Sequence, residues 1–454
     1  MKNNIILFAV ATLALNSCGI YKKYEPVATL PENLYREEIA PADTFSIGNI
    51  SWRDLFTDPA LQSLIERGLA NNTDLRIAHL KVQEAEVALM TSRLSYLPSL
   101  SLDPQGTTSS FNKAKASWTY NVPVSASWEI DIFGRLTNAK RQAKAALSQS
   151  QAYSQAVQTQ LIANIANLYY TLLMLDEQLD ISRQTEEAWK ETVASTRALM
   201  NAGLANESAV SQMEAAYYQV QGSVLDLQQQ ISQVENSLAL LLAETPRNYE
   251  RGMLVEQQFP ADFSIGIPVR MLSSRPDVRS AERTLEAAFY GTNAARSAFY
   301  PSITLSGSAG WTNSVGSMIL NPGKFVASAV GSLTQPLFNR GQVVAQYRIA
   351  RAQQEEAALG FQQTLLNAGS EVNDALTAYQ TSQGKRILLD KQVASLKTAV
   401  RSTSLLMEHS NTTYLEVLTA RQSLLSAQLS QTANHFTEIQ SLINLYRALG
   451  GGQE

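Results

Sequence analysis

Cys18 is the residue of this sequence whose surroundings point most directly to a chemical modification. It is the only cysteine of the chain, and it follows an apolar run from Ile5 to Leu15 that Lys2 precedes. A charged start before a short apolar stretch is typical of a secretory signal. A small residue, Ser17, before the cysteine resembles a bacterial lipobox, in which the signal is removed and the cysteine sulfur then carries lipid. The alternative is a secreted protein with an accidental cysteine, and in either case no intramolecular disulfide can form.

The other residues that could carry chemistry do not form a site. His79, His409 and His435 lie far apart and lack histidine or cysteine neighbours at the spacing of a zinc site. No glycine-rich loop leads into a Lys-Ser/Thr pair, so no phosphate-binding loop is predicted. The net charge of -4 and the pI of about 5.7 argue against nucleic acid as a partner. The sequence therefore predicts no enzyme, no cofactor and no metal site.

The elements that carry these residues occur twice. Residues between Asp74 and Leu102 recur at a constant offset of 203 positions, and matches continue at offsets of 205 and 207. Such a long internal repeat indicates a duplicated unit, here read as helix, hairpin, very long helix and returning helix. In the first unit we expect a helix at 74–96, strands at 99–109 and 117–131, a long helix at 135–200 and a return helix at 204–243. In the second unit we expect the same elements at 276–299, 302–312, 324–335, 341–409 and 414–447.

The helices have the pattern of a coiled coil. Apolar residues from Val210 to Leu241 recur at alternating steps of three and four, and Leu161 to Leu179 follow the same rule. The second unit keeps this pattern less strictly. A helix of about 66 residues is about 100 Å long, which is several times the width of a compact domain.

The strand at 117–131 has two unlike faces. Even positions from Trp118 to Ile130 are apolar, whereas odd positions are polar or proline. The strand from Ile303 repeats this alternation. Composition alone favours a half-buried strand of a soluble sandwich. We expect Pro123, which cannot donate to a ladder, to mark a bulge or bend.

The attached helices and the open sheet edges favour a membrane barrel instead. After Leu15 no apolar segment reaches the roughly 18 residues of a membrane-spanning helix. A spanning sheet must close on itself, and the smallest barrels have about eight strands, so copies of the chain must share one barrel. Two, three or four copies would give about 8, 12 or 16 strands. Trp118, Trp128 and Trp311 are then expected to anchor the sheet at the lipid interface.

Several motifs together resemble the outer membrane efflux protein family, which is TolC-like, and within it the NodT-type lipoprotein branch. These motifs are the lipobox, the duplicated unit, Tyr96–Ser99, Phe299–Ser302, Asp131–Arg135, Leu337–Gly341, Arg275–Asp277 and Tyr446–Gly452. The resemblance covers essentially the whole mature chain. It implies a mainly α fold with a transmembrane β part, in which a homotrimer shares a twelve-stranded β-barrel and a twelve-helix periplasmic α-barrel. It also implies a periplasmic adaptor (membrane fusion) protein and an inner-membrane pump of the resistance-nodulation-division type as partners.

The turns between long and return helices are the expected gate. Family relatives often place an aspartate ring at the second turn, and the aligned position here is Thr412, with Glu408 and Glu416 nearby. Glu207 lies at the first turn. Carboxylates from several copies around a narrow opening would focus negative potential. The alternative is that these are solvated carboxylates without a gating role.

The predicted function is a passive outer-membrane exit duct of a tripartite efflux pump, conducting drugs, toxic compounds or metal ions from periplasm to exterior. The alternatives are an exit duct for type I protein secretion, or a secreted coiled-coil scaffold that does not conduct. The predicted divisions are a signal peptide at 1–17, a lipid anchor and tether at 18–52, a first repeat at 53–243, a belt connection at 244–275, a second repeat at 276–449 and a tail at 450–454.

Overall fold

The computed structural model describes residues 23–25, 50–112, 115–257, 259, 275–313, 324–408 and 414–452. Cys18, the predicted signal peptide, most of the predicted tether and Thr412 lie outside the described residues. Most of the second half of the predicted belt also lies outside them.

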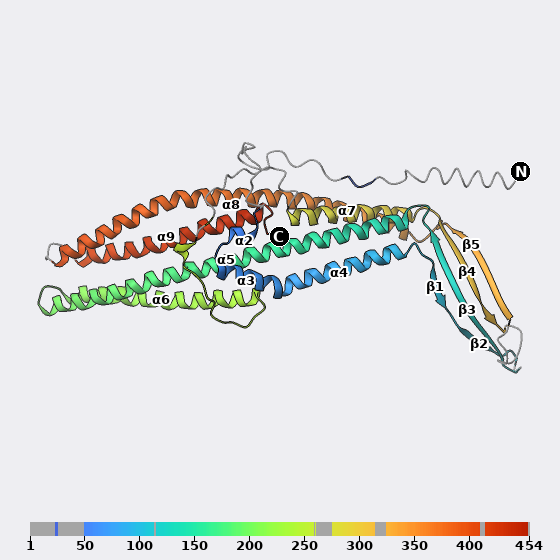
Figure 1. Cartoon of the computed structure of the whole chain (residues 1–454), viewed down its shortest axis with the longest axis horizontal. Coiled ribbons are helices and arrows are strands. Elements are labelled where there is room, and N and C mark those ends of the chain that lie inside the picture. The colour runs from blue at the N-terminus through green and yellow to red at the C-terminus, as the bar shows by residue number, and fades with distance from the viewer. Residues whose placement is uncertain are drawn as a thin grey trace. The chain divides into compact units, whose positions relative to one another are not determined.

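Long helices dominate the described chain (Figure 1). The first repeat contains α4 (Thr73–Leu94), β1 (Ser99–Leu102), β2 (Gln105–Ser109), β3 (Ser117–Ile130), α5 (Arg135–Asn201) and α6 (Glu207–Leu241). The second contains α7 (Pro276–Ser297), β4 (Ser302–Thr312), β5 (Lys324–Thr334), α8 (Gln342–Glu408) and α9 (Tyr414–Ala448). Equivalent helices have equal lengths: 22 residues for α4 and α7, 67 for α5 and α8, and 35 for α6 and α9. A duplicated unit would produce this equality.

Helix ends follow local capping. α3 (Pro59–Asn71) starts at the Asp58-Pro59 pair, in which aspartate is the N-cap and proline the first helical residue, and the Asp58 carboxylate accepts a hydrogen bond from the Ala60 amide at 2.9 Å. The first return helix begins at Glu207 rather than at 204, because Asn206 is its N-cap and accepts from the Ala209 amide. Gly203, in the turn before α6, has φ +77°, a conformation that glycine adopts readily.

The predicted tether ends too late. It was expected to include residue 52, but Trp52 starts a further short helix, α2 (Trp52–Leu55), and is only 1% exposed. Trp52, Leu55 and Phe56 all belong to the apolar core. The physical reason is that a tryptophan and a phenylalanine bury more apolar surface in the core than an extended segment could.

The predicted strand at 99–109 is wrong as a single element, because it breaks into β1 and β2. Its partner β3 stays continuous, and Pro123 pairs with Gly310 of β4. The break lies opposite Pro123, where the Asp103 amide donates to the Pro123 carbonyl at 3.2 Å. Neither Pro104 nor Pro123 has an N–H to donate, so the ladder between the two strands is interrupted there. The expected irregularity is therefore present, but in the neighbouring strand.

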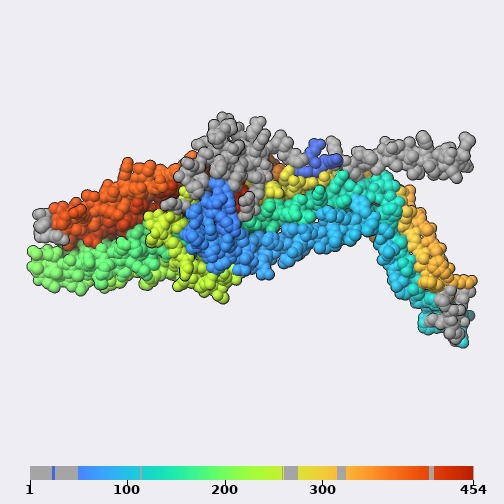
Figure 2. All heavy atoms as spheres, viewed as in Figure 1, coloured from blue at the N-terminus to red at the C-terminus, as the bar shows by residue number. Residues whose placement is uncertain are grey.

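All strand pairs of the sheet are antiparallel. The order is β1-β3-β4-β5, with β2 also pairing with β3. The β3–β4 pair joins the two repeats, and its register places Trp128 opposite Leu305. Every residue of β5 is exposed, and in the space-filling view β5 forms an open margin of the sheet (Figure 2). Each isolated chain thus carries unpaired backbone groups along its sheet edges.

The chain divides into two compact units, and each draws on both repeats. One comprises Met1–Thr29, His79–Ala152 and Arg279–Thr364 and contains the sheet; the other comprises Leu30–Ala78, Tyr153–Val278 and Leu365–Glu454. Among the described helices, none combines the length and apolar character of a membrane span.

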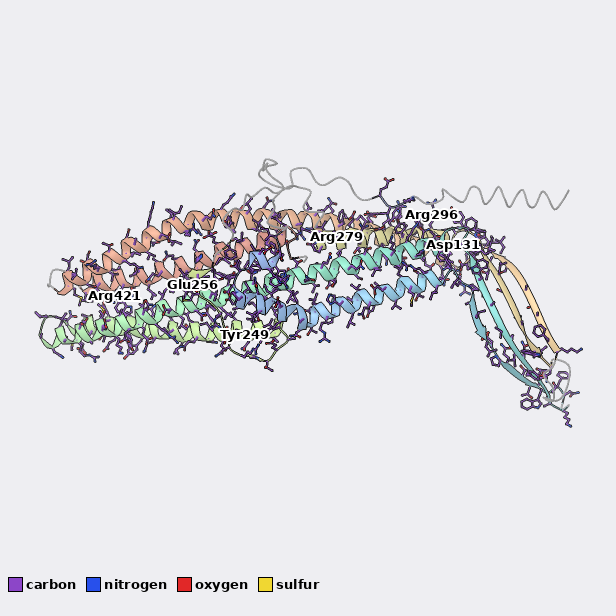
Figure 3. The ribbon with its side chains drawn as sticks, viewed as in Figure 1. Asp131, Tyr249, Glu256, Arg279, Arg296 and Arg421 are labelled. Atoms are coloured by element: carbon purple, nitrogen blue, oxygen red, sulfur yellow. The ribbon has the colours of Figure 1, made fainter. Side chains whose placement is uncertain are left out.

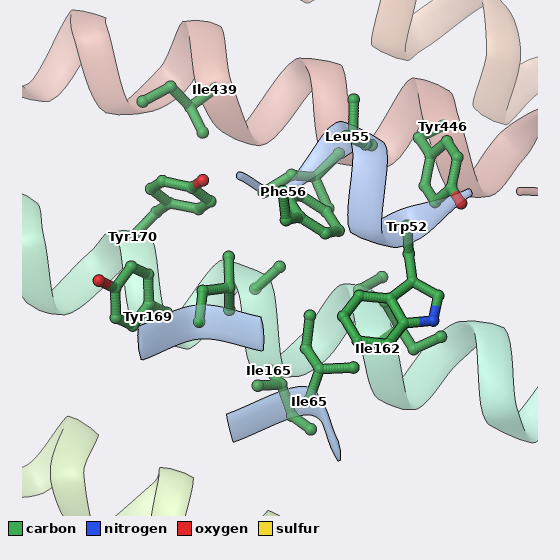
Figure 4. Close-up of a cluster of buried hydrophobic side chains, with 14 of the residues drawn as sticks. Trp52, Leu55, Phe56, Ile65, Ile162, Ile165, Tyr169, Tyr170, Ile439 and Tyr446 are labelled. Carbon is green, nitrogen blue, oxygen red and sulfur yellow. The ribbon is translucent and has the colours of Figure 1, made fainter. Parts of the chain in front are cut away.

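The apolar core lies in the second unit. α2 inserts between α5 and α9, and Phe56 meets the Tyr446 ring edge-on at 6.2 Å between centroids (Figure 4). Asp58 adds a polar link, because its carboxylate also accepts from the Tyr169 hydroxyl at 2.5 Å and from the Gln257 amide at 3.0 Å. These contacts fix residues 52–58 against the long helix α5.

Candidate functional site: the sheet faces and the helix turns

One face of the sheet is apolar on β1, β3, β4 and β5, whereas β2 contributes Gly106 and Thr108 to it. The register aligns Trp118, Tyr120, Val122, Val124, Ala126, Trp128 and Ile130 with Leu100, Leu102, Ile303, Leu305, Ala309, Trp311, Phe325 and Leu333. The three tryptophans predicted as anchors, Trp118, Trp128 and Trp311, lie on this face and are 54%, 42% and 49% exposed. Trp311 also packs edge-to-face on Phe325. Such a continuous exposed apolar surface needs a non-aqueous neighbour.

The opposite face is covered with hydroxyl groups. Its members are Ser99, Ser101, Thr107, Ser109, Ser117, Thr119, Ser125, Ser127, Ser302, Thr304, Ser306, Ser308, Thr312, Ser328, Ser332 and Thr334, together with Gln105, Asn121, Pro123 and Gly310. Val326 and Val330 of β5 also lie on this face and are its apolar exceptions. Hydroxyls bond across strands, as in Ser308–Ser328 at 2.8 Å. Within the strands this face carries charge at Glu129 and Lys324, at opposite ends of the strands. The face is thus polar but nearly free of fixed charge.

The corner between β3 and α5 is held by two carboxylates. Asp131 accepts from the Leu136 amide at 2.9 Å and from the Thr137 amide and hydroxyl at 2.8 and 2.6 Å (Figure 3). It therefore satisfies amides of the first helical turn that have no partner within the helix. Glu129 forms a two-point ion pair with Arg135. The sequence indicated Asp131 and Arg135 as motif residues, but not these roles.

The first turn places Glu207 at the start of α6. Its side chain is exposed, and it follows the N-cap directly. A carboxylate in the first turn of a helix is stabilised by the helix dipole, so Glu207 has a structural explanation beside the gating one.

The second turn is described only in part. Glu408 is the last residue of α8, and its side chain is outside the described part, as are residues 409–413. Glu416 is exposed in the first turn of α9. Beneath both turns, Trp189, Met213, Ala216 and Val220 form a buried cluster to which Tyr414 and Leu418 add. The N-terminal ends of α6 and α9 therefore share one apolar support, which brings Glu207 and Glu416 to the same end of the helical unit.

Arg421 is a charged residue near these turns that the sequence did not single out (Figure 3). Its guanidinium donates to the Ala188 carbonyl at 3.4 Å and lies 6.0 Å from the Trp189 ring centroid. Burial lowers the pKa of Arg421, and Glu191 opposes this effect. The Arg421 Nε has no hydrogen-bond partner within the described chain. Arg421 belongs to α9 and contacts α5, and these contacts compensate its positive charge only weakly.

Arg251 forms a largely buried ion network outside the turns. It donates to Asp176 on α5 at 2.5 and 3.0 Å and to Glu235 on α6 at 2.6 Å. These bonds, led by the one to Asp176, raise the pKa of Arg251 against the effect of burial. The network ties the connection after α6 to the first helical pair. Its partners are distant in sequence, so charge pattern alone gave no sign of it.

Among the described residues, no group of three or more histidine, aspartate or glutamate side chains is placed to hold a metal ion. The candidate functional features of the described residues are the two faces of the sheet and the turns between the long and the return helices.

Comparison with known proteins agrees with this reading. The sequence model of the outer membrane efflux protein family matches residues 64–244 and 267–451. The cation efflux system protein CusC of Escherichia coli O6:H1 is 30% identical, with 99% of this chain and 98% of CusC covered. The toluene efflux pump outer membrane protein TtgC of Pseudomonas putida is 28% identical over 100% of this chain and 96% of its own. A crystal structure of CusC superposes with a TM-score of 0.86 at 27% identity, covering 96% of this chain and 100% of that one.

The class is thus a channel protein of the outer membrane, with a sheet that has one apolar and one polar face and with very long helices. The chain belongs to the outer membrane efflux protein family and is the outer-membrane component of an efflux system. The family is a class of efflux ducts and not a class of enzymes. The predicted family, function and location are confirmed, and the mainly helical fold is as expected.

Proposed function

We propose that three copies of this chain close their sheets into one twelve-stranded barrel and their helices into a twelve-helix periplasmic tunnel. The open sheet edges carry this proposal. In lipid, the unpaired backbone groups of β5 and of the β1/β2 edge would find no partner, whereas neighbouring copies would pair them. The apolar face would then meet lipid and the hydroxyl face would line water.

Exposed apolar residues on α8 support association between copies. Leu359, Ile387 and Leu388 are 60%, 57% and 67% exposed, although α8 is the repeat of the well-buried α5. Helices of neighbouring copies would cover these side chains and remove them from water.

The hydroxyl face favours a passive conduit for small solutes of either charge. Serine and threonine can replace water around a passing solute without binding it through fixed charge. CusC is named for cation efflux and TtgC for toluene efflux, so we infer small toxic solutes as the cargo. A periplasmic adaptor protein and an inner-membrane pump of the resistance-nodulation-division type would supply the substrate and the energy. Protein secretion of type I is the second candidate.

Opening of the proposed tunnel would be controlled at the turns between the long and the return helices. Three copies of Glu416, with Glu408 and Thr412 nearby and Glu207 on the first turn, would surround the narrow end of the tunnel and attract cations. Lipid on Cys18 would add an anchor to the outer membrane.

The test of the duct is planar-bilayer conductance of the detergent-purified oligomer, combined with particle imaging. We expect a conducting trimer with an elongated body of roughly 100 Å. A monomeric, non-conducting protein would refute the duct.

Two sets of variants test the remaining parts. Glu416→Gln and Glu408→Gln should each lower cation preference in reversal-potential measurements, and unchanged selectivity in both would remove the proposed ring. Cys18→Ala should abolish labelling with radioactive palmitate. A variant that remains labelled would show that the lipid is elsewhere.

A further inference from the structure

A short piece of the N-terminal segment lies against α7 within one compact unit. The Tyr24 ring meets the Phe289 ring at 5.7 Å between centroids and at 62°. Phe289 in turn packs edge-to-face on Tyr290 at 5.5 Å, and the Arg141 guanidinium of α5 lies 5.7 Å from the Tyr290 ring centroid. Tyr290 is 8% exposed. Tyr24 is therefore the outer member of an aromatic stack that begins in the interior of the unit.

Tyr24 is half-buried between exposed neighbours. Lys23 and Glu25 face solvent, whereas the Tyr24 hydroxyl is buried and has no hydrogen-bond partner in the described part of the chain. Burial, followed by the nearby Glu282 and Glu286, raises the pKa of Tyr24 to about 12, and Arg283 opposes them. The ring and not the hydroxyl thus makes the attachment.

The docking position exists on one repeat only. At the repeat offset of 203, Phe289 and Tyr290 correspond to Glu86 and Val87 on α4. Val87 is 56% exposed and Glu86 is also exposed, so this part of α4 has no aromatic stack to receive a tyrosine. The contact is therefore specific to α7 rather than a general property of the repeated helix.

We propose that Tyr24 is a docking residue that fixes the N-terminal segment on α7 and thereby sets the distance between lipid at Cys18 and the end of the helices where the strands begin. This proposal rests on the proposed lipid attachment. Tyr24 is six residues after Cys18, so an extended chain allows the lipid to lie at most about 22 Å from the docking point. From Phe289 to the end of α7 at Ser297 is only about 12 Å of helix.

Without this contact the lipid would be held only loosely. The next described attachment along the chain is Trp52, and a fully extended chain from Cys18 to that residue would reach about 110 Å. Docking at Tyr24 therefore reduces the greatest distance between the lipid and an attached residue from about 110 Å to about 22 Å. The lipid then holds the start of the strands next to the membrane that they must enter.

The docking itself is tested by trypsin cleavage after Lys22 and Lys23 in the full-length protein. The open population of the segment should rise when the ring contact is lost, so Tyr24→Ala should be cleaved about three- to tenfold faster than the unchanged chain. Tyr24→Phe, which keeps the ring, should be cleaved at the unchanged rate. Equal rates for all three proteins would overturn the docking.

A photo-cross-linker keeps the test valid if Tyr24→Ala does not assemble. With benzoylphenylalanine at position 24, mass spectrometry should find cross-links to the α7 peptide around Phe289. Cross-links only to other segments, or none, would overturn the proposal.

The distance-setting role is tested by two insertions of the same flexible ten-residue Gly/Ser spacer. A spacer between Gly19 and Lys22 should slow formation of the oligomer in cells, as Tyr24→Ala should. A spacer after Glu25 should leave the rate of oligomer formation unchanged. Equal effects of both spacers would overturn this role.

A non-conducting oligomer would refute the duct alone, because protection from trypsin does not depend on conduction. A Cys18→Ala chain should keep that protection but lose the difference between spacers.

Discussion

The two helical hairpins, α5–α6 and α8–α9, have equal lengths. They differ in the row of residues along which the return helix packs on the long helix, here called the seam. The α6 residues that form the regular apolar series are Val210, Met213, Tyr217, Val220, Val224, Leu227, Ile231, Val234, Leu238 and Leu241. At the offset of 207, the α9 residues are Val417, Ala420, Leu424, Ala427, Gln431, Asn434, Glu438, Ser441, Leu445 and Ala448. The middle of the second seam has thus become polar, whereas the first is apolar throughout.

Three polar residues of the second seam have partners on α8, whereas the Ser441 hydroxyl donates to the Thr437 carbonyl of α9 itself. Gln431 donates to Asp390 at 2.7 Å, Asn434 donates to the Ser382 carbonyl at 2.9 Å, and Glu438 pairs with Arg386 at 3.3 Å. In the first hairpin, the corresponding part of α6 packs in an apolar cluster, which consists of Leu175, Leu179, Val224 and Leu227.

The apolar seam should hold its two helices together more strongly than the polar seam does. Burying an apolar side chain stabilises by about 1.5–3 kcal/mol, whereas a hydrogen bond contributes about 0.5–1.5 kcal/mol, because it replaces hydrogen bonds that the same groups make to water when the helices separate. We therefore expect α5–α6 to be the firm pair and α8–α9 the pair that separates more easily. This suits a gate in which the second turn moves against the first.

The largest effect should come from truncating equivalent seam positions. Leu227→Ala removes a side chain that is 9% exposed, and should lower the opening free energy of α5–α6 by about 3 kcal/mol. Asn434→Ala removes one bond and should cost α8–α9 about 1 kcal/mol. Hydrogen exchange resolved by helix measures both. Equal losses would mean that the seams do not differ in strength.

A second contrast lies at the corners that begin the long helices. Asp131 caps α5 with its side chain, whereas at the α8 corner the Gln342 amide donates to the backbone carbonyl of Asn339 at 2.8 Å. Asp131→Ala should therefore lower stability by about 1–2 kcal/mol, and Asn339→Ala by only a few tenths. Urea midpoints of the purified oligomers would show the difference. An equal shift would indicate that the Asp131 side chain does not act as the cap.

The repeat and the capping residues made the helices predictable. Their signals are local: Asp58-Pro59 starts α3, Gly203 marks a turn, and apolar steps of three and four continue through α6. The alternation in β3 and β4 also predicted which residues share a face, although not the pairing of β3 with β4 across the repeats. The break between β1 and β2 did not, because it depends on two prolines that meet only when the strands pair.

The features missed from the sequence all depend on distant partners. Arg251 gains its role from Asp176 and Glu235, and Tyr24 from Phe289, 265 residues away. A single charged or aromatic residue in a polar segment does not indicate which surface it will meet. The assignment of Cys18 and Thr412 stays a prediction, because both lie outside the described residues.

A smaller effect is expected where an ion pair of the first repeat has no equivalent in the second. Arg197 pairs with Glu214, but at the offset of 207 these positions are Ser404 and Arg421. Because burial disfavours the charge of Arg421, Arg421→Met should raise stability by up to about 1 kcal/mol. Arg421→Ala, the control, should lower it through lost packing. Urea midpoints distinguish the two, and a Met variant as unstable as the Ala variant would show that the charge itself stabilises.

The smallest effect is the salt response of the two seams. Arg386 is 53% exposed, so its pair with Glu438 should contribute at most about 0.5 kcal/mol and be screened by salt. Raising sodium chloride from about 0.05 M to about 1 M, where the Debye length falls to about 3 Å, should speed hydrogen exchange in α8–α9 by up to about twofold. The apolar part of the α5–α6 seam around Val224 and Leu227 should not be weakened, whereas the turn of α5–α6 that carries the Arg197–Glu214 pair should respond like α8–α9. Glu438→Gln should remove the response of α8–α9 at the second seam. If salt loosened both pairs equally, or if the response survived in Glu438→Gln, charge on the second seam would not be what makes it the weaker one, and its smaller apolar area alone would have to explain the difference.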